Sequence, residues 1–134
     1  MDSKDKQPQT GKNHNLWQAM GHAVDGIFQV IQSERNMRFH LASAVVVIIA
    51  GFICRISFDN WLWLIAAIFA VMSAEMINTI SEWLCDLVVG SHFHPLVKKI
   101  KDAAAGMVLL VALFAFIIGL LIFVPAIIKL LEGF

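Results

Sequence analysis

The chain has 134 residues, of which 59% are hydrophobic and 15% are charged, and its mean hydropathy is +0.76. A soluble domain of this size cannot bury so much apolar surface, so the composition predicts an all-α integral membrane protein. Ten lysines and arginines balance ten aspartates and glutamates. A chain without overall basic charge gives no reason to expect a nucleic-acid partner.

The N-terminal part divides into a tail and a helix. Residues 1–13 are polar and have little to bury, which predicts a disordered tail, and residues 14–134 are expected to form a single membrane domain. Between about residues 15 and 33 apolar side chains recur at helical spacing after Asn15, a good N-cap. This pattern predicts an amphipathic helix in the membrane interface, with an ordinary helix packed on the bundle as the alternative.

Three long apolar stretches follow, at about residues 39–56, 61–89 and 97–130, and each is long enough to cross a membrane. Gly90 fits a left-handed cap at the end of the second. With three spans, the N-terminal segment and the basic turn at 98–101 share one side, and together they hold eight of the ten lysines and arginines. The positive-inside rule predicts that this side is cytoplasmic, whereas the other side keeps only Arg55 and Lys129.

The second span carries an acidic stripe at its cytoplasmic end, formed by Glu75, Asn78, Glu82 and Asp86. Offsets of three, seven and eleven residues fall within an arc of about 80° on a helix that turns about 100° per residue. Because carboxylates are costly at membrane depth, the stripe must face a partner, a cation or water, and it marks a functional site. Further ionisable groups are expected at a similar depth on neighbouring helices: Glu34, Arg38, Lys101 and Asp102.

Carboxylates with an asparagine, and no cysteine cluster, suit a hard cation such as Mg²⁺, which binds one or two carboxylates plus substrate phosphates. A nearby lysine can contact phosphate oxygens. The residues suggest nucleotide chemistry at a membrane surface, with proton paths or helix contacts as alternatives. An ion or proton transporter needs polar groups through the whole membrane, but residues 61–74 offer only Ser73 and residues 103–128 offer none. A purely structural subunit gives no reason for the clustered charges.

Three motifs resemble the prokaryotic diacylglycerol kinase family, and more closely its undecaprenol kinase branch from Gram-positive bacteria. They are ERNMRFH at 34–40, AEMINTISEWLCDLV at 74–88 and H-x-L-x-K-x-I-KDAAAG at 94–106. The resemblance covers nearly the whole chain after the tail. Ile80, Ser81 and Ile100 depart from the usual family residues, and these departures change packing rather than charge.

The resemblance implies a homotrimer of three-span subunits, each with an N-terminal surface helix, whose active sites are shared between neighbours. It implies an ATP- and Mg²⁺-dependent lipid kinase in the bacterial cell membrane, with the N-terminus and active site on the cytoplasmic side. The implied acceptor is the hydroxyl of undecaprenol, with diacylglycerol as the alternative, giving undecaprenyl phosphate or phosphatidic acid.

By the same resemblance, Glu75 is the general base, Glu34 and Glu82 are the Mg²⁺ ligands, and Asn78 orients the γ-phosphate or Glu75. The implied nucleotide contacts are His22, Glu34, Glu82, His92, His94, Lys101 and Asp102. Asp86 and Arg38 are expected in supporting or substrate-contacting positions. The chain has no G-x-x-x-x-G-K-[ST] loop, so carboxylate-bound Mg²⁺ and lysine would hold the phosphates.

Plainer structural roles are also open for several of these residues. Glu75 can be a buried acid that is hydrogen-bonded to Asn78, and Asp86 can be a solvated helix end. Lys98 and Lys99 fit interfacial anchors better than ligands. Two histidines in a loop, without a third ligand, are weak evidence for a metal site.

Overall fold

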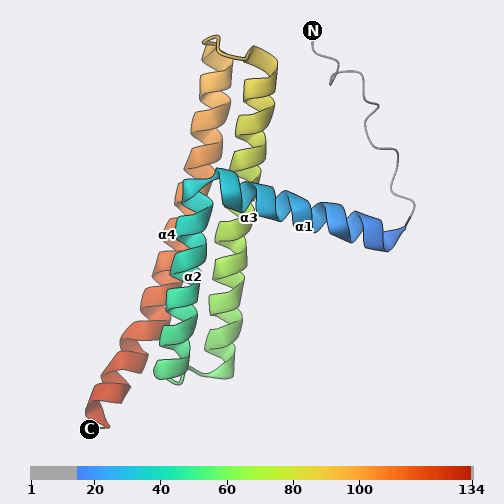
Figure 1. The fold of residues 1–134 in the computed structure, drawn as a ribbon. Helices are drawn as coiled ribbons and strands as arrows, with labels where there is room; N and C mark the ends of the chain where they lie inside the picture. Colours follow the sequence, from blue (N-terminus) through green and yellow to red (C-terminus); the bar gives the residue numbers. More distant parts are fainter. Residues whose placement is uncertain (1–14, 134) are drawn as a thin grey trace.

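The computed structural model describes residues 15–133 and consists of four helices (Figure 1). They are α1 (Leu16–Ser33), α2 (Arg35–Ile53), α3 (Phe58–Val89) and α4 (Pro95–Glu132). The described part of the chain contains no strand, which confirms the predicted all-α fold. The predicted tail at residues 1–13 lies outside the described residues.

Helices α2, α3 and α4 are each long and apolar enough to cross a membrane, in agreement with the three predicted spans. Helix α2 has 19 residues, whereas α3 has 32 and α4 has 38. At 1.5 Å per residue α3 and α4 are about 48 and 57 Å long, well beyond the roughly 30 Å apolar core of a bilayer. Figure 1 shows them as a hairpin that continues past the first turn of α2. Part of this hairpin therefore has to emerge from the membrane.

Helix α1 leaves the bundle sideways, at the level where α2 begins (Figure 1). Its first turn is capped as predicted, because the Asn15 side chain accepts a hydrogen bond from the backbone N–H of Gln18 at 2.8 Å. Glu34, in an extended conformation, separates α1 from α2. Arg38 closes this corner, since its Nη1 donates to two carbonyls in the last turns of α1 at 3.1 and 2.7 Å.

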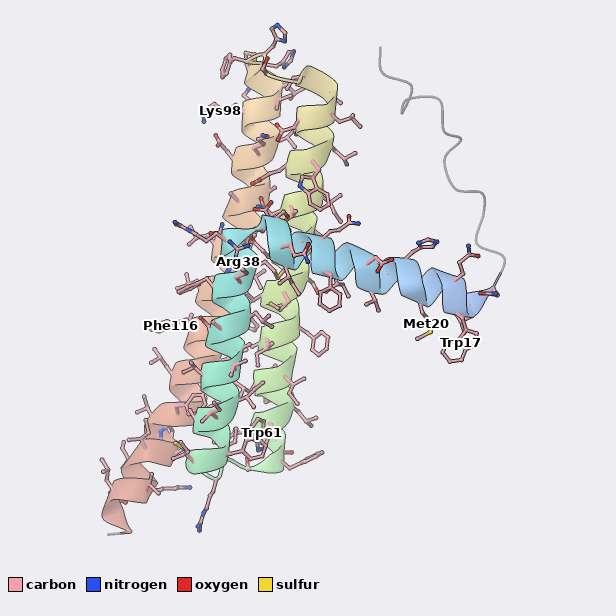
Figure 2. All side chains as sticks on the ribbon, in the orientation of Figure 1. Trp17, Met20, Arg38, Trp61, Lys98 and Phe116 are labelled. Atoms are coloured by element: carbon pink, nitrogen blue, oxygen red, sulfur yellow. The ribbon has the colours of Figure 1, made fainter. Side chains whose placement is uncertain are left out.

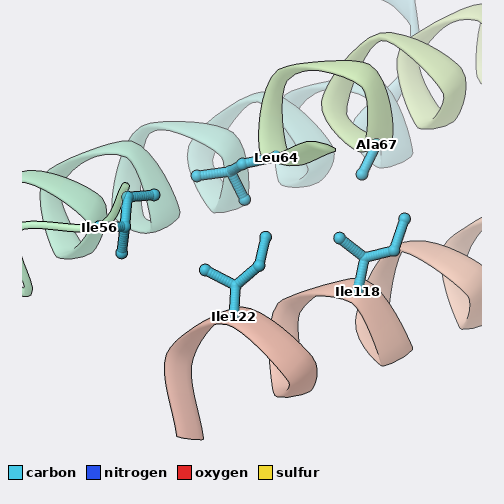
Figure 3. Packing of buried hydrophobic residues seen from close by; sticks show 5 residues of the cluster. All are labelled: Ile56, Leu64, Ala67, Ile118 and Ile122. Carbon is cyan, nitrogen blue, oxygen red and sulfur yellow. The ribbon is translucent and has the colours of Figure 1, made fainter. Parts of the chain in front are cut away.

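The hydrophobic core lies toward the other end of the bundle. The buried residues of this cluster come from the α2–α3 turn, α3 and α4, and Figure 3 shows them packed together: Ile56, Leu64, Ala67, Ile118 and Ile122. Helix α2 joins this packing through Gly51, where an added Cβ would lie only 2.8 Å from the Trp61 ring. Because position 51 has no side chain, α2 can approach α3 closely. The contact fixes the height of α2 along α3, and hence the height of the α1–α2 corner.

At the tip of the hairpin, α3 ends at Gly90, as predicted. Gly90 has φ 57°, which glycine adopts readily, but its ψ of −125° differs from the left-handed helical value that the sequence predicted. Helix α4 then begins at Pro95, a favoured residue for a first helical turn. The His94 side chain caps it by accepting a hydrogen bond from the N–H of Leu96 at 3.2 Å.

Candidate active site

The acidic stripe runs along α3 with an exposure that rises toward the hairpin tip. Glu75 is 1% exposed and Asn78 is 6% exposed. Glu82 is half-buried and Asp86 is exposed. One helix face thus carries polar groups from the protein interior to the solvent-accessible end of the hairpin.

Glu75 lies in the interior of the bundle with an unsatisfied carboxylate. Within the described residues neither of its carboxylate oxygens is hydrogen-bonded, and Asn78 Oδ1 is unpaired as well. The Asn78 amide instead donates to Glu82 Oε1 at 3.1 Å, so the alternative in which Asn78 binds Glu75 is not observed. An unsatisfied buried polar atom costs about 1–3 kcal/mol. These oxygens therefore mark a place that favours a donor or a cation from outside the single chain.

The α1–α2 corner brings further groups to Glu75. The Glu75 carboxylate interacts electrostatically with Glu34 and His40, on the α2 side, and with Glu82 on its own helix. Within one protomer, the predicted base therefore lies within electrostatic reach of both predicted metal ligands. Glu34 and Glu75 are far apart in the sequence. Their proximity depends on how α2 packs on α3 and cannot be predicted from the sequence.

Two residues near Glu75, Asn36 and His40, were not among the residues that the sequence predicted. The Asn36 side chain approaches the Glu75 carboxylate, although without a properly formed hydrogen bond. The sequence feature that could have identified them is their spacing of four residues in the first turns of α2, which puts both on one helix face. Thr79 was also missed. It is fully buried, and its hydroxyl donates to the Glu75 carbonyl at 3.0 Å.

Ion pairs organise the basic turn at the start of α4. Lys101 Nζ lies 2.6 Å from Asp86 Oδ1, and Lys98 Nζ lies 2.5 Å from Asp102 Oδ2. Lys101 therefore stands level with Asp86, about one turn nearer the hairpin tip than Glu82. Exposed pairs of this kind contribute little to stability. Either lysine can exchange its carboxylate for a phosphate at low cost.

The three predicted histidines lie in two places, and both places are away from Glu34 and Glu82. His22 is exposed on α1, twelve residues before Glu34 and thus about 18 Å away along the helix axis. His92 and His94 are exposed beyond the end of α3, which itself lies about 10 Å along the axis from Glu82. One protomer alone does not bring all the predicted nucleotide contacts together.

The donor chemistry near Glu75 fits Mg²⁺, although it does not form a complete metal site. Among residues 15–133 no three His, Cys, Asp or Glu side chains are arranged to hold a metal ion by themselves. Mg²⁺ often binds only one or two carboxylates and completes its shell with phosphate oxygens and water. Glu34 and Glu82 supply two such carboxylates, and the unpaired oxygens of Asn78 and Glu75 belong to the same stretch of α3 as Glu82.

Comparisons with known proteins identify related kinases. The chain is 41% identical over 125 residues to the undecaprenol kinase of Bacillus subtilis, an alignment that covers 93% of this chain and 98% of that protein. It is 34% identical over 117 residues to a diacylglycerol kinase of Synechocystis, covering 87% and 67% of the two chains. For a diacylglycerol kinase of Helicobacter pylori the identity is 32% over 105 residues, covering 78% and 81%. Residues 21–123 match the family described as prokaryotic diacylglycerol kinase, and the chain belongs to that family.

Proposed function

We propose that this protein is a membrane lipid kinase that transfers the γ-phosphate of ATP to the hydroxyl of undecaprenol, giving undecaprenyl phosphate. The observation that carries the proposal is the 41% identity to an undecaprenol kinase over nearly the whole length of both chains. Such an enzyme has to bring a water-soluble nucleotide to a lipid hydroxyl. The acidic stripe suits this task, because it begins with a buried carboxylate at Glu75 and ends with an exposed one at Asp86.

The carboxylates lie at different depths along α3, and we assign them different roles for this reason. Glu75 is assigned as the general base that accepts the proton of the lipid hydroxyl, since it is buried and unpaired. Glu82 lies seven residues nearer the hairpin tip, about 10 Å along the axis. Glu34 and Glu82 would hold Mg²⁺, which when bound offsets the charge of the transferring phosphate. Asn78 keeps the Glu82 carboxylate in place through its amide.

The nucleotide contacts are proposed to be completed by a neighbouring subunit in a homotrimer. His22 and His94 are exposed and lie well along the helices from Glu34 and Glu82 within one protomer, and Asp102 is exposed on α4. Closed rotational symmetry would bring the same surfaces of a second copy to each site. Lys101 and Asp102 would then contact the nucleotide of a shared active site, together with His22, His92 and His94.

Helix α1 is proposed to lie on the membrane surface. Figure 2 shows Trp17 and Met20 pointing from α1 toward the end of the bundle that holds Trp61, and they are 79% and 50% exposed. An apolar, aromatic helix face turned toward the hydrocarbon layer is typical of interfacial helices. The membrane surface would then meet the bundle near Glu34, with the tip of the α3–α4 hairpin in water. The basic residues on this side favour the cytoplasm of a bacterial cell.

Diacylglycerol is the alternative acceptor, because two relatives carry the name diacylglycerol kinase and both lipids offer a primary hydroxyl. A transporter is disfavoured by the distribution of buried polarity. Within the described chain the buried polar side chains are Glu75, Asn78 and Thr79, whereas the core of the other half is hydrocarbon. Among residues 15–133, the buried polar side chains therefore form no path through the middle of the bundle, where an ion would have to pass.

A side-by-side assay tests the proposal. Purified full-length protein in lipid nanodiscs would receive ATP with labelled γ-phosphate, Mg²⁺ and equal amounts of undecaprenol or diacylglycerol, and the phosphorylated lipids would be separated by chromatography. Faster labelling of undecaprenol is the expected result. Preference for diacylglycerol would reassign the acceptor, and labelling of neither lipid would reject a lipid kinase.

A further inference from the structure

A cavity lies at the end of the bundle opposite the acidic stripe. It has a volume of about 520 Å³ and opens between the α2–α3 turn and the last turns of α4. Two of its apolar wall residues, Ile56 and Ile122, also belong to the buried core (Figure 3). Its polar lining consists of Arg55, Ser57, Asn60 and Lys129. The cavity thus combines hydrocarbon walls with two cations, at a size typical of small-molecule sites.

Within the described part of the chain, neither cation of this cavity forms an ion pair with a carboxylate. Among residues 15–133 the ion pairs formed by lysine or arginine are those of Lys98 and Lys101, both at the other end of the bundle. Asp59 and Glu132 are close to the two cations in sequence, but neither lines the cavity. Helix α3 also begins here, and its first turn is capped by the Ser57 side chain, which accepts a hydrogen bond from the N–H of Asn60 at 3.3 Å.

Arg55 occupies a backbone conformation that suits glycine better. Its φ is 48°, and within the described chain it is the only non-glycine residue with a positive φ. A turn that needs only this backbone geometry would be served better by glycine, so the arginine side chain has a use beyond the turn. Arg55 and Lys129 are also the two cations on the side that the positive-inside rule expects to be poor in basic residues.

We propose that this cavity binds the phosphate headgroup of an anionic phospholipid, with Arg55 and Lys129 on the phosphate and the acyl chains along the apolar residues of α4. Phospholipids surround this end of a membrane-spanning bundle, and basic pockets between transmembrane helices suit their headgroups. The lipid would join the α2–α3 turn to the last part of α4. This part contains Pro125 and diverges from the other helices in Figure 1.

The test measures lipid retention by the full-length protein in native mass spectrometry, with phosphatidylglycerol or phosphatidylcholine of identical acyl chains. We expect tighter binding of phosphatidylglycerol. Arg55→Gly suits the local φ and should fold, and Lys129→Gln changes an exposed helix surface. Each should weaken phosphatidylglycerol binding about fivefold and both together about 25-fold, as expected for basic residues near a membrane surface. Helical content measured by circular dichroism checks that each variant folds.

Controls separate this site from general charge effects. Lys99→Gln removes an equal charge at the other end of the bundle and should leave phosphatidylglycerol binding unchanged, and Arg55→Lys should retain most of it. Equal binding of the two lipids, or unchanged binding by the double variant, would overturn the proposal. Displacement of the lipid by inorganic phosphate at concentrations equal to that of the lipid would also overturn it, because a site for free phosphate gains nothing from the apolar walls.

Discussion

Asn78 donates its side-chain amide to Glu82 across one turn of α3, at 3.1 Å from Oε1. Residues four apart on a helix face the same way, so the bond holds the Glu82 carboxylate against its own helix. Both carboxylate oxygens of Glu75 remain unpaired within the described chain. One acid of the stripe is thus fixed in position, and the other is available to accept a proton.

Asn78→Ala should release the Glu82 carboxylate. Loss of a group that orients a metal ligand typically costs about 10- to 100-fold in metal affinity or activity. We expect the Mg²⁺ concentration for half-maximal kinase activity to rise by a factor in this range. Ser81→Ala is a suitable control, because the Ser81 hydroxyl donates to the carbonyl of Ile77, whereas the Asn78 amide donates to Glu82. An unchanged Mg²⁺ dependence in Asn78→Ala would separate Asn78 from the metal ligands.

Glu82→Gln should abolish lipid phosphorylation while the protein remains folded, inserted and oligomeric, because a neutral amide is a poor Mg²⁺ ligand. Glu34→Gln should behave in the same way. The matched control is Glu132→Gln, which makes the same change in an exposed residue at the end of α4. Activity is measured across a range of Mg²⁺ concentrations, and normal activity of Glu82→Gln at normal Mg²⁺ would exclude its role as a ligand.

Subunit mixing tests whether active sites are shared. Glu75→Gln and Asp102→Asn are each expected to be inactive alone. If α3 of one subunit works with α4 of its neighbour, random mixing in equal amounts should restore about a quarter of wild-type activity, since each intact residue is present at half of the sites. The control is a mixture of Glu75→Gln with Glu34→Gln. These two residues interact within one protomer, so no recovery is expected. Failure of the first mixture, after verified subunit exchange, would favour sites within single chains.

Gly51→Ala should weaken the packing of α2 on α3. Its Cβ would lie 2.8 Å from the Trp61 ring, which would have to shift, and overpacking of this kind typically costs about 1–3 kcal/mol. Gly119→Ala is the control, because a Cβ at position 119 meets nothing within 4 Å and alanine favours a helix. Thermal unfolding in detergent should show a lower midpoint for the first variant only. Equal midpoints would show that the Trp61 ring moves aside freely.

The sequence predicted those features of the fold that depend on nearby residues. The helical periodicity, the cap at Asn15 and the end of α3 at Gly90 all follow from residues within a few positions of one another. The face of α3 that carries Glu75 could be predicted for the same reason. These local signals also explain why the three spans were found.

The relationships between helices could not be predicted in this way. The position of Glu34 relative to Glu75 depends on the axial register of α2 against α3. The contact between Gly51 and Trp61 sets this register. The pairing of Lys101 with Asp86 depends likewise on the register of the α3–α4 hairpin. Helical periodicity carries no information about either register.

The assignment of Glu75 as the general base and Glu82 as a Mg²⁺ ligand is tested most directly by Glu75→Gln. Nucleotide affinity and turnover are measured in the same membrane preparation, with Glu82→Gln for comparison. Removal of a general base typically lowers the rate by about 10² to 10⁴, and we expect a loss of turnover in this range with MgATP affinity close to that of the wild type. A loss of MgATP affinity in proportion to the loss of turnover would contradict the assignment and place Glu75 among the metal ligands.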